Sequence, residues 1–212
     1  IDLEACRARG IVVANVRGYA EHTVPEHVMA LLLALSRNLV AWRETLQAGR
    51  WQQSDQFCLF DHPIRDLHGA TLGLIGSGSL GNGVLRLAEA FGMRVLRAER
   101  KGAGHVRPGY TAFEAVLAEA DAISLHCPLT PDTLGLVSWQ RLRLMKPGAF
   151  LINTSRGGLV VEADLAEALN RGQLAGAAVD VVGREPIRPD NPLLTARNCT
   201  ITPHIAWATR EA

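Results

Sequence analysis

Three residues of types used in catalysis follow three short apolar runs in the later part of the chain: Arg156, Glu185 and His204. An arginine presents a planar, permanently charged fork that suits a substrate carboxylate and a neighbouring carbonyl oxygen. A histidine titrates near neutral pH and can donate a proton to that oxygen, while a carboxylate beside it favours its protonated form. Together, these three residue types suit the reduction of a 2-oxo acid.

Each of these residues also has an ordinary structural explanation. An arginine after a strand commonly forms a surface or interdomain ion pair, a histidine after a proline is commonly a loop residue, and a Glu-Pro pair in a loop is usually solvated. The catalytic interpretation therefore depends on the three residues converging. Convergence is expected if the apolar runs are parallel strands of one sheet, because ligands of such sheets bind beyond the carboxyl ends of the strands.

The segment 70–99 contains the motif that predicts such a sheet. An apolar run of strand length leads into Gly76, Gly78 and Gly81 in G-x-G-x-x-G spacing, then a helical apolar pattern and a second strand ending at Glu99. In a dinucleotide site the first glycine permits a tight turn, the second lets backbone approach a pyrophosphate, and the third lets helix and strand pack closely. The helix N-terminus adds N–H groups for the phosphates. The structural alternative is a tight βα turn without a ligand. The presence of strand, glycines, helix, second strand and terminal acid in this order favours a nucleotide site.

Glu99 bears on the choice of cofactor. A carboxylate at this position accepts hydrogen bonds from the ribose hydroxyls and repels a 2′-phosphate, which favours NAD. Arg100 and Lys101 follow directly and partly offset that repulsion, so NADP is the alternative. Asp180, near the end of a later strand, could bond the nicotinamide amide.

The composition argues against several classes of function. The 212 residues carry 22 basic and 21 acidic side chains, a balance that gives no field to attract nucleic acid or an anionic membrane. The longest apolar run, residues 29–35, is far shorter than the roughly 20 residues that span a bilayer. The four cysteines show no C-x-x-C spacing and the histidines lack metal-ligand partners, so we expect a reduced, cytoplasmic protein without a metal.

A regular alternation of strand and helix patterns begins at residue 70. We expect strands at 71–75, 95–98, 122–126, 149–153, 177–181 and 200–202. Helical patterns at 113–120, 131–145 and 162–170 lie between them, whereas the connection 183–198 is too Pro-rich for a regular helix. The predicted fold class is α/β, a doubly wound parallel sheet (Rossmann) with helices on both faces.

Before residue 70 the pattern is less regular. Residues 2–9 are predicted to end a helix and residues 11–14 to form a strand. A capping box that starts at Thr23 opens an apolar helix over 23–39, which we expect to be buried or to meet a partner subunit. Residues 43–61 mix aromatic and polar side chains, which favours a partly helical excursion packed on a second subunit.

Motifs along nearly the whole chain indicate a family. In chain order they are VPEHVMALLLALSR, LGLIGSGSLG, ADAISLHCPLTPDT, LMKPGAFLINTSRGGLV, LAGAAVDVVGREP and ITPHIAWAT. With these motifs the sequence resembles the D-isomer-specific 2-hydroxyacid dehydrogenases. Within that family it is most similar to the glycerate dehydrogenases, or hydroxypyruvate reductases, as GMRVLRAERKG and PHIAWAT suggest.

The resemblance implies an NAD(H)-dependent exchange between a small 2-oxo acid and its D-2-hydroxy acid, either hydroxypyruvate and D-glycerate or glyoxylate and glycolate. It implies Arg156 as the substrate binder, His204 as the general acid/base and Glu185 as the acid that pairs with His204. The implied cofactor-binding residues are Gly76, Gly78, Ser79, Leu80, Gly81, Glu99, Cys127, Pro128, Thr154, Arg156, Asp180 and His204. A homodimer built on the helix near 23–39 is also implied.

By the same resemblance, residues 1–15 are the C-terminal remnant of a second, flavodoxin-like substrate domain, residues 16–204 the NAD-binding domain, and residues 205–212 the start of a return helix. We therefore expect the 212-residue chain to bind NAD with little or no turnover, because the loop that holds the substrate carboxylate belongs to the substrate domain. A second hypothesis, from another class, is an NAD(H)-sensing binding protein of the co-repressor type, which keeps the same three catalytic-type residues.

Overall fold

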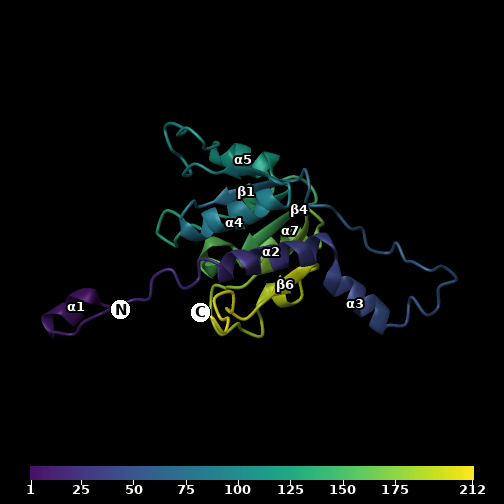
Figure 1. Ribbon diagram of the computed structural model, residues 1–212, viewed down its shortest axis with the longest axis horizontal. Helices are drawn as coiled ribbons and strands as arrows, with labels where there is room; N and C mark the ends of the chain where they lie inside the picture. The colour runs from purple at the N-terminus through teal and green to yellow at the C-terminus, as the bar shows by residue number, and fades with distance from the viewer.

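Six parallel strands form one sheet in the computed structural model, which describes residues 1–212 (Figure 1). In spatial order they are β2 (Arg94–Arg97), β1 (Thr71–Ile75), β3 (Ala122–Leu125), β4 (Ala149–Asn153), β5 (Leu174–Val179) and β6 (Cys199–Ile201). Every neighbouring pair is parallel. The predicted doubly wound parallel sheet is confirmed. Each strand expected after residue 70 is present, β1 and β4 with the expected bounds and the other four with ends shifted by one to three residues.

Helices cover both faces of this sheet. On one face lie α2 (Thr23–Ser36) and α4 (Ser79–Ala90); on the other lie α5 (Phe113–Glu119), α6 (Trp139–Leu142) and α7 (Glu162–Asn170). Side chains of β4 alternate between the two cores, because Phe150 and Ile152 pack with α2 and α4 while Leu151 packs with the opposite layer. Burial on both faces explains why the inner strands β1, β3, β4 and β5 are mainly apolar, whereas the edge strand β2 begins and ends with an arginine.

The strand order reverses at β1. From β1 the chain passes through α4 to β2 on one side, and later reaches β3 on the other side. Ligands of doubly wound sheets bind in the crevice at such a switch point, outside the carboxyl ends of the strands. The loops that follow β1 and β3 touch there, since a Cβ on Gly76 would collide with the backbone of His126.

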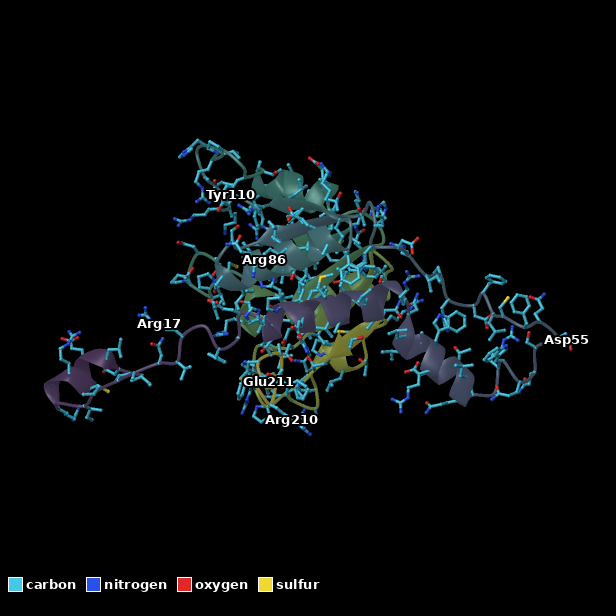
Figure 2. The ribbon with its side chains drawn as sticks, in the orientation of Figure 1. Arg17, Asp55, Arg86, Tyr110, Arg210 and Glu211 are labelled. Atoms are coloured by element: carbon cyan, nitrogen blue, oxygen red, sulfur yellow. The ribbon has the colours of Figure 1, made fainter.

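Two segments project from the sheet in opposite directions. At one end, α1 (Leu3–Ala8) and residues 9–17 stand away from the body; at the other, α3 (Leu39–Gln47) leads into a long irregular segment with Asp55 at its far tip (Figure 1; Figure 2). No single helix is long and apolar enough to cross a membrane. Only α2 and α3 taken together, bent by 53°, have the length and composition for it.

Several predictions for the first part of the chain were wrong. Residues 11–14 form no strand, because no sheet neighbour pairs with them and the side chain of Val12 is 91% exposed. The capping box is absent, because Thr23 is already helical and His22 at the N-cap makes no side-chain hydrogen bond. The helix expected over 23–39 is present as α2, which ends at Ser36, and Asn38 with φ 52° separates it from α3.

Two further helix predictions fail later in the chain. In the segment 131–145 only α6 is helical: Gly135 has φ +59°, which interrupts a right-handed helix, and Val137 forms a bridge with Val160 instead. Residues 205–212 form turns and no helix. The connection 183–198 contains the short 3₁₀ helix η2 (Pro192–Leu194), which agrees with its Pro-rich sequence.

Candidate active site

The turn after β1 has the backbone that its glycines predict. Gly76 has φ +106°, and a Cβ on it would lie 2.5 Å from the carbonyl carbon of His126. A Cβ on Gly81 would lie 2.2 Å from the carbonyl oxygen of Gly76, so α4 packs directly on the turn. Gly78 differs, because a Cβ there would meet nothing within 4 Å. That bare, open backbone is what the close approach of a pyrophosphate requires.

Unsatisfied polar groups lie at this turn and after β4, at the same edge of the sheet. Gly78 is the N-cap of α4 and no side chain caps the helix, which leaves the first N–H groups, from Ser79 and Leu80 onward, without a side-chain acceptor. The hydroxyl of Ser77 is buried without a hydrogen-bond partner, and so is the hydroxyl of Thr154 after β4. Buried polar groups are normally paired. These orphaned groups and the bare backbone fit a polar ligand of the dinucleotide type.

The loop after β3 is tied to the loop after β4. The hydroxyl of Ser155 donates to the carbonyl oxygen of Cys127 at 2.7 Å. This bond places Cys127 and Pro128 at the same edge of the sheet as Thr154. Burial raises the pKa of the Cys127 thiol, so the thiol is neutral at physiological pH and acts as an apolar lining group.

Arg156 lies on a loop that is shaped by its neighbours. The side-chain amide of Asn153 donates to the carbonyl oxygen of Arg156 at 2.9 Å, and its oxygen accepts the N–H of Ser155 at 3.1 Å. A Cβ on Gly157 would lie 1.9 Å from the carbonyl carbon of Val182, so the loop after β4 rests directly on the loop after β5. Arg156 itself is exposed and is thereby carried to the edge where Glu185 lies.

Glu185 and His204 are in direct contact. The Nδ1 atom of His204 lies 2.6 Å from Oε2 of Glu185, and the N–H of Val182 donates to Oε1 of the same carboxylate at 3.1 Å. Partial burial raises the pKa of Glu185, but the hydrogen bonds from His204 and Val182 and the charge of Arg156 outweigh it and hold the pKa below its ordinary value. The carboxylate is therefore ionised at neutral pH and orients the imidazole through Nδ1, which leaves Nε2 for a ligand.

Asp180 fixes the segment that carries His204. Its buried carboxylate accepts the N–H of Ile205 at 3.0 Å, the N–H of Ala206 at 2.9 Å and the hydroxyl of Thr202 at 2.5 Å. His204 adopts φ 56°, a left-handed conformation that is uncommon outside glycine, and these bonds help to hold it there. Most of the accepting capacity of Asp180 is thus directed to the chain itself.

Glu99 lies after β2, as expected, and its carboxylate is hydrogen-bonded within the chain. It is buried, and both of its oxygens accept hydrogen bonds from the guanidinium of Arg107, at 2.7 and 2.8 Å. These bonds, with the N–H groups of Arg100 and Arg107, outweigh burial and lower the pKa of Glu99 to about 2.

The structure brings His204 and Glu185 into contact. The sequence reasoning missed the residues that arrange these loops. Asn153 and Thr202 organise the loops, Gly157 lets two loops touch, and Arg107 pairs with Glu99. A buried asparagine at the end of an apolar strand was a usable signal, because such an amide must find partners. Nothing in the sequence singled out Arg107 among the neighbouring cations.

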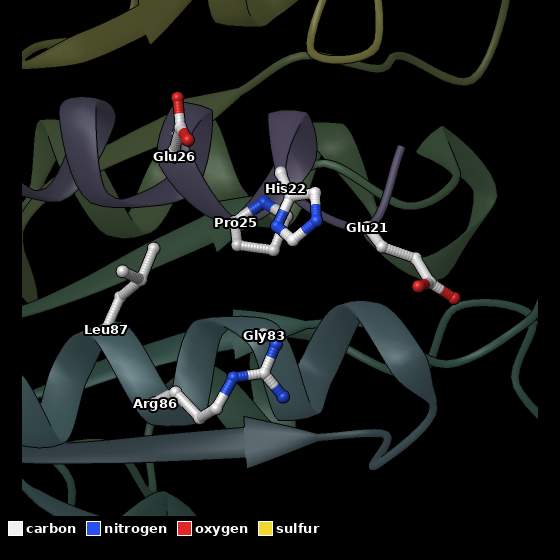
Figure 3. A pocket seen from close by; sticks show the side chains of 7 residues that line it. All are labelled: Glu21, His22, Pro25, Glu26, Gly83, Arg86 and Leu87. Atoms are coloured by element: carbon white, nitrogen blue, oxygen red, sulfur yellow. The ribbon is translucent and has the colours of Figure 1, made fainter. Parts of the chain in front are cut away.

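A separate hollow of about 180 Å³ lies between α2 and α4 (Figure 3). It is lined by Glu21, His22, Pro25, Glu26, Gly83, Arg86 and Leu87. A Cβ on Gly83 would lie 2.5 Å from Cγ of Pro25, so the two helices meet closely beside it. None of the strand-end residues lines this hollow, which is a packing gap outside the candidate site. No three His, Cys, Asp or Glu side chains gather in a metal-binding arrangement.

Known proteins of one family are similar to this chain in sequence and in fold. Residues 29–206 match the family model for the NAD binding domain of D-isomer specific 2-hydroxyacid dehydrogenases. The chain is 47% identical to the glycerate dehydrogenase of Methylorubrum extorquens and 39% identical to the hydroxypyruvate reductase of Blautia hydrogenotrophica, covering 100% of this chain and 67% of each relative. The crystal structure of the TT0316 protein from Thermus thermophilus is similar with a TM-score of 0.87 at 43% identity, covering 99% of this chain and 66% of that one. The chain thus spans about two thirds of the length of these proteins.

Proposed function

Because the chain belongs to the D-isomer-specific 2-hydroxyacid dehydrogenase family, we propose that it forms the NAD(H)-binding part of an oxidoreductase acting on small 2-oxo and 2-hydroxy acids, with His204 as general acid/base. The observation that carries this proposal is the 2.6 Å contact between His204 Nδ1 and Glu185 Oε2 at the edge where the glycine turn lies. The chemistry supplied by a bound reduced nicotinamide is hydride donation.

The residues of this chain would divide the remaining work. Arg156 binds the carboxylate of the 2-oxo acid and polarises its carbonyl oxygen. His204 donates a proton from Nε2 to that oxygen in reduction and takes it back in oxidation. Glu185, ionised and bonded to Nδ1, fixes the ring orientation and stabilises the imidazolium. Gly76, Gly78 and the start of α4 receive the pyrophosphate.

The substrate pair that we propose first is hydroxypyruvate and D-glycerate, with glyoxylate and glycolate second. Support comes from the names of the two relatives, a glycerate dehydrogenase and a hydroxypyruvate reductase.

We also propose that residues 16–204 act as the NAD-binding unit and that residues 1–15 belong to a flavodoxin-like substrate unit. The exposed apolar side chains of that segment, Val12 among them, favour packing against further structure.

We further propose a cytoplasmic homodimer. The projecting α3 exposes Leu39, Val40 and Leu46, and the irregular segment beyond it exposes Phe57 and Phe60. Exposed apolar side chains on an extended arm favour contact with a second subunit. Sedimentation of the protein would distinguish a dimer from a monomer directly.

The test of the chemical proposal uses the complete protein with hydroxypyruvate or glyoxylate and NADH. His204→Gln and Glu185→Gln should each lower kcat, His204→Gln by about a hundredfold or more, since a positioned acid/base contributes that much. His68→Gln is the matched control, because His68 precedes β1 at the opposite end of the strands and should leave kcat unchanged. Normal reduction by both site variants would contradict the mechanism.

Two comparisons separate the remaining alternatives. The 212-residue chain should bind NADH but reduce hydroxypyruvate little or not at all, and turnover equal to that of the complete protein would contradict its assignment as the cofactor-binding part. A co-repressor would instead capture partner peptides in an NADH-dependent manner. Both relatives described above are named as enzymes, which gives the co-repressor hypothesis no support.

A further inference from the structure

His27 is a half-buried polar side chain on α2, a helix that packs on the sheet. Its neighbours Val24 and Val28 are buried in the core beneath that helix. The side chain of His27 is 21% exposed, and its Nε2 atom lies 3.1 Å from the hydroxyl oxygen of Thr202. Thr202 follows β6 and precedes His204 by two residues. A helix of the covering layer therefore contacts the segment that carries the candidate acid/base.

The direction of these hydrogen bonds follows from the groups on either side of Thr202. The two oxygens of the Asp180 carboxylate accept the backbone N–H groups of Ile205 and Ala206, and an ionised carboxylate has no hydrogen to donate. The Thr202 hydroxyl therefore donates its single hydrogen to Oδ1 of Asp180, 2.5 Å away. Only its lone pairs remain, so the hydrogen in its bond with His27 comes from Nε2 of the imidazole.

Thr202 connects two groups that do not bond directly. Nε2 of His27 lies 3.7 Å from Oδ1 of Asp180, beyond hydrogen-bond distance, and the hydroxyl contacts both. Successive hydrogen bonds polarise one another, so a donor at His27 strengthens the bond between Thr202 and Asp180. Asp180 is buried and its carboxylate accepts the two N–H groups that follow His204, so the orientation of this carboxylate determines where the His204 backbone lies.

We propose that His27 is a positioning residue for His204, acting through the Thr202 hydroxyl and the Asp180 carboxylate. This inference rests on the proposed function, because it assigns proton transfer to His204. No hydrogen bond joins His27 to His204 or to Glu185, so its effect passes through the intervening residues. A bond that only tied α2 to the sheet would lower stability when it was lost and would leave proton transfer unchanged. The two roles therefore differ in their effect on kcat.

Steady-state kinetics of the complete protein with hydroxypyruvate and NADH test the inference. His27→Leu removes the donor and should lower kcat by about threefold to tenfold, the effect of one net hydrogen bond, while the KM for NADH changes much less. His27→Gln, whose amide N–H can replace that of Nε2, should recover most of kcat. An unchanged kcat in His27→Leu would overturn the proposal.

His22→Leu is the matched control for this substitution. His22 lies at the start of the same helix, is exposed and makes no side-chain hydrogen bond to cap it (Figure 3). The control should leave kcat unchanged. Equal losses of kcat in His22→Leu and His27→Leu would mean that the helix, and not the His27 donor, is responsible, and would contradict the proposal.

A double-mutant cycle tests the route through Thr202. Thr202→Val removes the hydroxyl and should lower kcat at least as much as His27→Leu does. If His27 acts through that hydroxyl, adding His27→Leu to Thr202→Val should lower kcat little further, because residues of one hydrogen-bond network are not additive. Fully additive losses would rule out this route.

Imidazole nitrogen NMR of the 212-residue chain gives a measurement that needs no turnover. Nε2 of His27 should carry hydrogen, and the ring nitrogen resonances of His204 should shift in His27→Leu but not in His22→Leu. A His27 ring without hydrogen on Nε2, or His204 resonances that stay in place, would overturn the inference. Failure of the unchanged complete protein to reduce hydroxypyruvate and glyoxylate would instead overturn the proposed function, and the His204 resonances would still decide whether His27 positions this ring.

Discussion

The backbone N–H of His204 donates to the main-chain carbonyl of Asp180 at 2.8 Å, and the carboxylate of Asp180 accepts the two backbone N–H groups that follow, at Ile205 and Ala206. The end of β5 therefore holds the segment after β6 at three consecutive residues. Because His204 adopts a left-handed conformation there, the position of the imidazole depends on a residue that does not touch it through its side chain. The position of the His204 imidazole is therefore set by buried backbone bonds as much as by the Glu185 contact.

Asp180→Asn should destabilise the fold and displace His204. An amide supplies one acceptor atom, so its NH₂ group would face a backbone N–H. Losing such charge-assisted bonds inside the protein should lower the free energy of unfolding by roughly 2–4 kcal/mol, measured by urea denaturation. Asp190→Asn, at an exposed carboxylate paired with Arg188, should change it by less than about 1 kcal/mol. Equal stability of the two variants would contradict this role for Asp180.

The Glu185 carboxyl should report the loss of His204. In the unchanged chain its pKa lies below the ordinary value because bonds from His204 and Val182 outweigh the effect of partial burial. In His204→Gln the burial remains and the strongest of these bonds is weakened, so the pKa of Glu185 should rise. Carboxyl-carbon NMR titration measures the shift. The pKa of Glu99, held at about 2 by Arg107, should not move and serves as an internal control.

Gly78→Ala should separate folding from cofactor binding. A Cβ at Gly78 would meet nothing within 4 Å and the backbone has φ −73°, so the thermal midpoint of the free chain should stay within a few degrees. The added methyl group would occupy the space that a pyrophosphate needs, so NADH affinity should fall by about tenfold or more.

Gly81→Ala gives the contrast for that experiment. Its Cβ would lie 2.2 Å from the carbonyl oxygen of Gly76, so it should lower the thermal midpoint as well as the NADH affinity. Fluorescence titration with NADH measures the affinity. If Gly78→Ala bound NADH as tightly as the unchanged chain, this result would argue against a pyrophosphate at this turn.

The sheet could be predicted from sequence because its signals are local. Strands buried on both faces read as apolar runs, and the glycine spacing identifies the first turn whatever the rest of the chain does. The convergence predicted for Arg156, Glu185 and His204 was argued from topology, since parallel strands bring their carboxyl ends to one edge, and the structure shows His204 in contact with Glu185. The strand predicted at 11–14 and the helix predicted at 131–145 were wrong, because tertiary contacts override local sequence patterns. Residues 11–14 find no partner strand, and the segment 131–145 is interrupted at Gly135.

Pairings across loops could not be predicted in the same way. The hydrogen bonding of Glu99 depends on the loop 100–107 turning back so that the side chain and N–H of Arg107 both reach one carboxylate. The contact of Gly157 with Val182 depends on two loops far apart in sequence. Residue types limit which ion pairs can form. The loop conformation decides which cation meets which carboxylate, and loops show no periodic sequence pattern from which it could be predicted.

Because of the Glu99–Arg107 pair, the free energy of unfolding should fall as the pH is lowered into the acid range. The pKa of Glu99 is lowered from 4.5 to about 2 in the folded chain, so its contribution to the free energy of unfolding is fully present above pH 4.5 and is lost as pH falls toward 2. The stability difference between the unchanged chain and Glu99→Gln should therefore be constant from pH 7 to about pH 5 and should shrink between about pH 4.5 and pH 3. Urea denaturation at a series of pH values measures it. Arg107→Gln should show the same narrowing, because either substitution removes the pair, and a difference that stays constant down to pH 3 would mean that the pair does not hold the carboxylate ionised.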